Sequence, residues 1–376
     1  MTNGPGVNSQ PFEELEGLDT ASADGWGDYP LDSVFVRTET RTVSEVARRI
    51  EGDRYILDPE FQRDFVWNST KQSKLIESCI MRIPLPVFYV AEAPDGRIIV
   101  VDGLQRLTTF VRFLNDELKL TGLGNADSHF GSHMLEGKFF RDLPVGLQER
   151  VLDTQLTMYI LDAKAPERAR LDIFERVNSG EPLTRQQMRN ALYSGPATTW
   201  LREASLLPSF QTATGGSLNK KTMRDREAIN RFCAFKLLGS NAYNTSDMDS
   251  FLADGLVKLA KLSQDERANL LENFNRVMKM NYSMFGEHAF RKSLADQPPK
   301  ARSVINISLL EVASIAMSTI IFEDQNHVGQ VRDGLRQLLR SDNDFIQAIT
   351  YSTNSTTAVK TRHFKLTKLV KDASAK

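Results

Sequence analysis

The sequence has few cysteines, no long apolar run and no cation near its start. Only Cys79 and Cys233 occur in 376 residues, and neither belongs to a C-x-x-C or Cys/His cluster. A disulfide scaffold and a zinc ribbon are therefore not expected. No apolar run reaches the ~18 residues of a membrane span, and no basic-then-apolar signal pattern opens the chain. We expect a cytoplasmic protein that does not enter a membrane.

Positive charge is absent from the first 36 residues, although Lys and Arg total 47 against 48 for Asp and Glu in the whole chain. The net charge of -1 excludes a globally basic nucleic-acid coat but leaves room for a local basic patch. The acidic, Gly- and Ser-rich start has no sustained periodicity. It predicts a disordered acidic tail over residues 1–34, most simply a solubilising extension, with mimicry of nucleic-acid phosphates as the alternative.

The remaining chain is too long for most single cores, and its apolar periodicity changes along its length. Residues 35–183 mix strand and helix patterns, including a hairpin of strands 87–90 and 97–101 around the turn at 94–96. From residue 184 to residue 376 the patterns are mainly helical. We therefore predict an α+β protein, with a small mixed α/β head over 35–183 followed by an all-helical body over 184–376.

The segment with the clearest chemistry follows the second strand of this hairpin. An apolar strand delivers Asp102 and Gly103 to the start of a helix, where free N–H groups and the helix dipole form an anion site. The Arg106 guanidinium suits phosphate oxygens, while Asp102 suits a Mg²⁺ ion or orients a water. The structural alternative is an N-cap Asp102 with an i,i+4 ion pair to Arg106.

A second candidate segment, residues 58–67, places polar groups among aromatic side chains. Gln62 and Arg63 are suited to phosphates or a base edge, and Phe65 or Trp67 to stacking on a ring. The alternative is that the aromatic residues belong to the core and Arg63 to the surface.

Five groups of motif residues follow one another in the chain: Phe61-Gln62-Arg63 with Val66-Trp67, Ile83-Pro84-Leu85-Pro86, Asp102 to Thr109, Phe174 to Gly180 with Leu183-Thr184, and Asp225-Arg226-Glu227 with Arg231-Phe232. Their order and spacing resemble one family, the N-terminal domain of GmrSD-type modification-dependent restriction endonucleases. The resemblance covers residues 43–238.

This resemblance implies a ParB/sulfiredoxin-like head in which a Gly-x-x-Arg helix start, here Gly103 to Arg106, binds nucleotide phosphates. It implies a nucleoside triphosphate with Mg²⁺ as ligand and Asp102, Gln105 and Arg106 as the catalytic set. The implied nucleotide-binding residues are Gln62, Arg63, Trp67, Gly103, Arg106, Thr108 and Asn178. The family's usual signature is Asp-Gly-Gln-Gln-Arg, and this sequence has Leu104 in place of the first Gln. The substitution is compatible with phosphate binding but weakens the case for efficient hydrolysis.

Nuclease activity is not expected of this chain alone. Many family members carry a C-terminal His-Asn-His module, which opens with an Asp-His pair, and none of the five histidines here follows an Asp. His129 and His133 flank Gly131 in a Gly/Asp/Ser-rich loop that is ill suited to a metal pair. Basic residues further along are candidates for DNA contact, against the alternative of a solvated helix face: Lys220, Lys221, Arg224, Arg362, Lys365 and Lys368.

The favoured interpretation is a nucleotide-binding, NTP-hydrolysing component of a prokaryotic restriction or defence system. Its expected partners are a nucleoside triphosphate, DNA and a separate nuclease or defence subunit, and an oligomer is compatible with the sequence. Two alternatives remain: a non-catalytic DNA-binding or assembly subunit on the same fold, and a nuclease whose ParB-like pocket itself cuts DNA.

Overall fold

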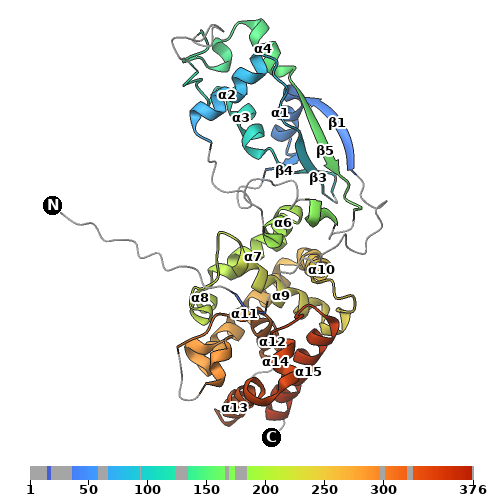
Figure 1. Cartoon of the computed structure of the whole chain (residues 1–376), viewed down its shortest axis with the longest axis vertical. Coiled ribbons are helices and arrows are strands. Elements are labelled where there is room, and N and C mark those ends of the chain that lie inside the picture. Colours follow the sequence, from blue (N-terminus) through green and yellow to red (C-terminus); the bar gives the residue numbers. More distant parts are fainter. Residues whose placement is uncertain are drawn as a thin grey trace, which may run out of the picture. The chain divides into compact units, whose positions relative to one another are not determined.

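The chain folds into two compact units, described here from a computed structural model. The structure describes residues 15–17, 36–57, 67–93, 95–123, 134–165, 169–173, 184–296, 301–319 and 325–374. We call residues 26–194 the sheet unit, and residues 195–376 with the residues before 26 the helical unit. A small mixed sheet followed by a helical body confirms the predicted α+β class (Figure 1). No helix among the described residues is long and apolar enough to cross a membrane.

The sheet unit is built on five strands in the order β1-β5-β3-β4-β2. The β1/β5 and β3/β4 pairs are antiparallel, and the β3/β5 and β2/β4 pairs are parallel. The predicted hairpin is therefore confirmed as β3 and β4. The strands are β1 (Val36–Thr42), β2 (Tyr55–Ile56), β3 (Phe88–Glu92), β4 (Ile98–Asp102) and β5 (Gln155–Leu161).

Helices cover one face of this sheet (Figure 1). They are α1 (Val43–Glu51), α2 (Ser69–Ile80), α3 (Leu104–Leu114) and α4 (Val145–Leu152). Because side chains alternate along a strand, Phe88, Val90 and Val100 point to this face and are buried with Ile76 and Phe110 of the helices.

The opposite sheet face has a separate apolar cluster. Ile99 and Val101 of β4 are buried there with Met188 and Leu192 of α6 (Arg185–Leu192). The structure therefore assigns α6 to the sheet unit and places the boundary after Ser194, whereas the sequence placed it after residue 183. Helical periodicity alone could not show that the apolar side of α6 completes the sheet.

The helical unit contains most of the other α-helices of the described residues. They are α7 (Pro196–Leu206), α8 (Pro208–Thr214), α9 (Arg224–Leu238), α10 (Met248–Lys261), α11 (Gln264–Phe285), α12 (Ile307–Met317), α13 (Gln325–Ser341), α14 (Asn343–Ala348) and α15 (Thr356–Ser374). Aromatic rings of different helices meet in its interior, including Phe232 and Phe274 with ring centroids 4.9 Å apart.

Part of the predicted acidic tail packs on the helical unit, which corrects the prediction of disorder for residues 15–17. Glu16 forms a parallel bridge with Asn306, and its carboxylate pairs with Lys292. The carbonyl oxygen of Gly17 accepts hydrogen bonds from Ser308 Oγ at 2.8 Å and Thr353 Oγ1 at 3.0 Å. Composition could not predict this contact, because the two hydroxyl donors lie 291 and 336 residues further along the chain.

A buried carboxylate, Glu311 of α12, joins three helices of the helical unit. It accepts hydrogen bonds from Arg231 of α9 at 3.0 Å and from Arg362 of α15 at 2.7 Å, and His363 Nε2 lies 3.1 Å away. Burial by itself would raise the pKa of Glu311, but Arg362, His363 and Arg231 outweigh burial and hold it at about 2. The carboxylate is therefore charged and fully paired inside the unit.

Replacing Glu311 should be severely destabilising, because Glu311→Gln leaves two buried guanidinium groups without their counter-charge. We expect a loss of about 3–5 kcal/mol in the free energy of unfolding at neutral pH, measured by urea denaturation. Glu272→Gln on the exposed side of α11 is the matched control.

The pH dependence of unfolding should report the same carboxylate. Since the pKa of Glu311 in the folded state lies below its ordinary 4.5, its stabilisation is complete above about pH 4.5 and is lost as the pH falls toward 2. Glu311→Gln should flatten this acid limb of the wild-type stability curve. Parallel curves for the two proteins would contradict the assignment.

Candidate functional site

The junction between β4 and α3 has the geometry that the sequence predicted for an anion site. Asp102 ends β4, and Gly103 takes up the left-handed conformation with φ of 104° before α3 begins at Leu104. A Cβ on Gly103 would lie 2.3 Å from Phe88 Cδ1, so only glycine fits. Among the residues that the structure describes, no side chain caps α3, and within this part of the chain its first-turn N–H groups are left for a ligand or water.

The Arg106 side chain is buried against the protein. Its guanidinium donates to the carbonyl oxygens of Pro86 and Val87 at 2.5 and 3.1 Å, and to Asp102 Oδ2 at 2.8 Å. The guanidinium carbon also lies 4.1 Å from the centre of the Phe88 ring. Burial lowers the pKa of Arg106, and the Asp102 carboxylate opposes that shift.

The contact of Arg106 with Asp102 is the i,i+4 ion pair of the structural alternative, but the N-cap of α3 is Gly103 and not Asp102. Arg106 is only 8% exposed, and its terminal nitrogens are engaged by the protein. It therefore holds the chain before β3 against the start of α3 and orients Asp102. A direct phosphate contact by Arg106 would require this network to open.

The other described residues of the predicted site stand around the same helix start. The Asp102 side chain is 45% exposed and so is accessible to a ligand. Gln105 Oε1 accepts a hydrogen bond from the Trp67 backbone N–H at 3.4 Å, and Thr108 is half-buried one turn further along α3. The structure thus brings Trp67 to Gln105. The Trp67 ring packs against the core, and Lys71 Nζ lies 4.6 Å from the centre of that ring.

Leu104, which replaces the first Gln of the usual signature, packs against the apolar cluster under the sheet. Leucine at this position therefore contributes to the core. This agrees with the interpretation that the substitution leaves the helix start intact and removes only a polar group.

Several predicted residues lie outside the described part of the chain: Gln62, Arg63, Asn178, His129 and His133. Among the described residues, no group of three potential ligands is placed to hold a metal ion. Within the described part of the chain, the carboxylate of Asp102 is available at the junction. Mg²⁺ is commonly bound through one or two carboxylates together with substrate phosphates, so the residues present fit a Mg²⁺ that arrives with a nucleotide.

The structure corrects two of the predicted DNA contacts. Arg362 is fully buried and paired with Glu311, so it stabilises the helical unit and cannot reach DNA. Lys365 is half-buried between the carboxylates of Asp342 and Asp344 at 2.5 and 3.0 Å. Both residues follow a basic pattern in the sequence, but their counter-charges come from distant helices.

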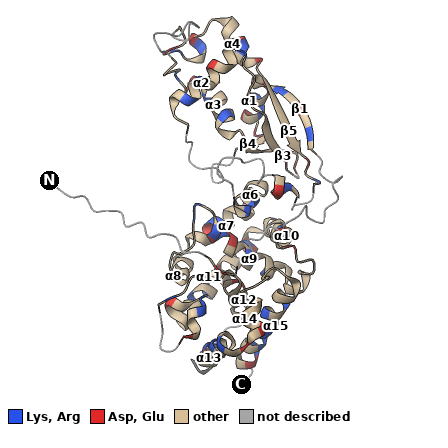
Figure 2. Cartoon of the chain, viewed as in Figure 1, with Lys and Arg blue, Asp and Glu red and all other residues tan. Residues whose placement is uncertain are grey.

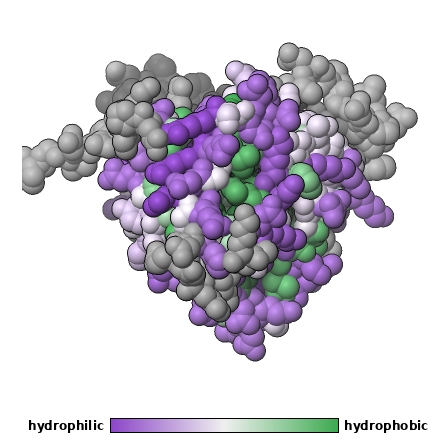
Figure 3. Space-filling model, turned by 90° about the horizontal axis from the view of Figure 1, so that it is seen from below, coloured by the Kyte–Doolittle hydropathy of each residue, from purple (hydrophilic) through white to green (hydrophobic). Residues whose placement is uncertain are grey.

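The other basic candidates remain nearer the surface. Arg224 is partly buried and paired with Glu227 at 2.6 Å, whereas Lys220, Lys221 and Lys368 are exposed. Acidic and basic residues are interspersed along the described helices (Figure 2). The face in Figure 3 is mainly hydrophilic, with small apolar areas.

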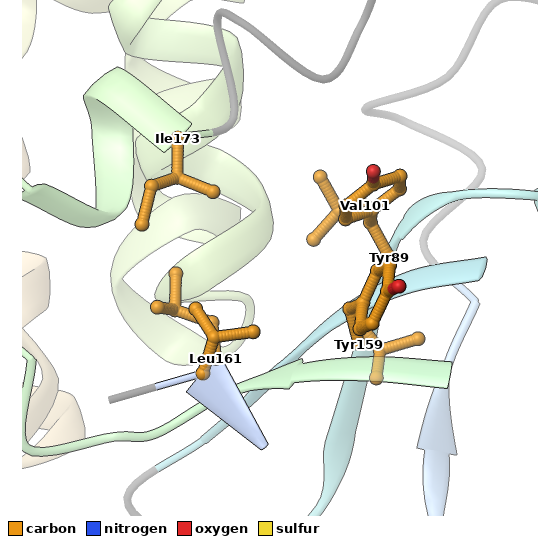
Figure 4. A pocket seen from close by; sticks show the side chains of 7 residues that line it. Tyr89, Val101, Tyr159, Leu161 and Ile173 are labelled. Atoms are coloured by element: carbon orange, nitrogen blue, oxygen red, sulfur yellow. The ribbon is translucent and has the colours of Figure 1, made fainter. Parts of the chain in front are cut away.

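The sequence did not predict an apolar pocket on the second face of the sheet. The pocket has a volume of about 230 Å³ and is lined by Val36, Tyr89, Val90, Val101, Tyr159, Leu161 and Ile173. The Tyr89 and Tyr159 rings lie together, with centroids 5.4 Å apart, across from Leu161 and Ile173 (Figure 4). The available signal was strand alternation, which places both tyrosines on the face opposite to Phe88 and Met158.

Arg106→Ala should lower the free energy of unfolding of the sheet unit by about 2–3 kcal/mol, because it leaves the Pro86 and Val87 carbonyls and the Asp102 carboxylate without their donor. Arg97→Ala in the same hairpin removes only a partly exposed ion pair with Asp95 and should cost less than about 1 kcal/mol. Urea denaturation measures both. Equal free energies of unfolding for the two variants would show that the hydrogen bonds of Arg106 contribute little to stability.

Comparison with known proteins supports the resemblance that the motifs indicated. Residues 43–194 match the family described as GmrSD restriction endonuclease, N-terminal domain. No curated protein and no solved structure matches the chain. The matched region contains β3, β4, the junction and α6. Residues 43–194 therefore match the GmrSD restriction endonuclease N-terminal domain family, and this match indicates a component of a restriction or defence system.

Proposed function

We propose that the sheet unit binds a nucleoside triphosphate with Mg²⁺ at the β4–α3 junction, as the nucleotide-responsive part of a restriction or defence system. The observation that carries this proposal is the uncapped start of α3 after the left-handed Gly103, next to the exposed Asp102. Oriented N–H groups at a helix start favour phosphate oxygens.

Asp102 makes this site dependent on a cation. A carboxylate next to the phosphates repels them, and a divalent ion bound between the two reverses the sign of that interaction. Mg²⁺ would be held by Asp102 and the nucleotide, where it neutralises phosphate charge. Arg106 acts as a positioning residue, because it fixes the Asp102 carboxylate from the buried side.

Two features of the junction favour nucleotide binding with slow turnover over efficient hydrolysis. Leu104 has no polar group to orient a water, and the Gln105 side-chain oxygen already accepts a hydrogen bond from Trp67. We therefore propose that nucleotide binding is the main event at this site, with hydrolysis much slower than binding and release.

The Mg²⁺ dependence of nucleotide affinity tests this proposal. Calorimetric titration of the full chain with ATP and GTP should show binding that weakens at least tenfold when Mg²⁺ is removed. Asp102→Asn should reduce that ratio to near one, because both the repulsion and the Mg²⁺ ligand are lost. Glu117→Gln, an exposed change of the same charge beyond the far end of α3, should leave it unchanged. Absence of binding, or an unchanged ratio in Asp102→Asn, would overturn the proposal.

The second candidate function is DNA binding by the helical unit, which the exposed Lys220 and Lys221 before α9 favour. Each phosphate contact contributes about 0.9 to the slope of log affinity against log salt. The double variant Lys220→Gln/Lys221→Gln should therefore reduce that slope by about 1–2 in a duplex-binding titration. The double variant Lys258→Gln/Lys261→Gln, at exposed positions on α10, is the matched control. Equal slopes would remove these lysines from the interface.

A further inference from the structure

We infer that the apolar pocket on the second sheet face receives the base of the bound nucleotide, which stacks on Tyr89 and Tyr159. This inference rests on the proposed nucleotide site and adds to it the place and chemistry of base recognition.

The pocket is built largely from the strands that form the junction. Val101 lines it, and the next two residues are Asp102 and Gly103. Tyr89 also pairs with Asp102 in the β3/β4 register, beside an irregularity at Tyr89 and Val90. A base in the pocket and phosphates at the helix start would therefore lie at the same end of β4, where Tyr89 pairs with Asp102.

The pocket is large enough for one part of a nucleotide but not for the whole molecule. Pockets that hold complete small-molecule ligands usually measure about 300–1,000 Å³, whereas this one measures about 230 Å³. It accommodates a planar ring system and excludes the charged phosphates. The mainly aliphatic remainder of its lining, including Leu161 and Ile173, offers no counter-charge to an anion.

The two tyrosines provide the chemistry that favours a base over an alkyl chain. Their half-buried rings present aromatic surface for stacking. Within the described residues, neither hydroxyl has a hydrogen-bonding partner, so both are available to the polar edge of a base. A phenolic hydroxyl donates and accepts and therefore tolerates more than one kind of base.

Comparison of a nucleotide with inorganic tripolyphosphate separates the base pocket from the phosphate site. With Mg²⁺ present, the full chain should bind ATP or GTP about tenfold more tightly than tripolyphosphate, as one stacked base would provide. Tyr159→Leu should remove most of that preference and leave tripolyphosphate affinity unchanged. Tyr159→Phe should keep the stacking, and Tyr351→Leu, which replaces an exposed tyrosine of the helical unit, should have no effect.

A measurement on the unaltered protein tests the same inference without depending on whether a variant folds. Saturation-transfer NMR should show stronger saturation of the base protons than of the ribose protons when ATP or GTP binds. Three outcomes would reject the base pocket but not the phosphate site. They are equal affinity for nucleotide and tripolyphosphate, equal loss of both affinities in a folded Tyr159→Leu protein, and weak saturation of the base protons. If neither nucleotide nor tripolyphosphate binds, the proposed function fails together with this inference.

Discussion

The candidate site depends on one buried arginine. Arg106 holds the carbonyl groups of Pro86 and Val87, the Asp102 carboxylate and the Phe88 ring in a single arrangement. These groups belong to the chain entering β3 and to the end of β4, so the guanidinium fixes the hairpin to the start of α3. The helix start can remain uncapped and open because its geometry is set from behind by this network.

The C-terminal end of β4 lies between a polar site and an apolar site. The helix start offers N–H groups and one exposed carboxylate, while the opposite sheet face offers two tyrosine rings in an apolar pocket. Strand alternation makes this separation possible, since consecutive residues point to opposite faces. A ligand with a charged end and a planar end would suit both environments, and this is the physical basis for proposing a nucleotide.

Charge has a different role in the helical unit. Glu311 is paired with Arg231 and Arg362 in the interior, and these three residues come from α12, α9 and α15. Arg362, one of the basic residues near the C-terminus, is therefore used inside the fold. Lys365 is likewise paired with two carboxylates, so the surface available to a nucleic acid is smaller than the sequence indicates.

The sequence by itself determined the α+β class, the β3–β4 hairpin, and the strand-Asp-Gly-helix element with its family resemblance, because each depends on residues close together in the chain. Only the tertiary structure decided that Arg106 faces the protein, that Arg362 is buried, that α6 completes the sheet, and that Tyr89 and Tyr159 share a pocket. The partners in these contacts come from separate elements. A local pattern identifies which side chains can pair, but their burial and their actual partners are set when distant elements pack together.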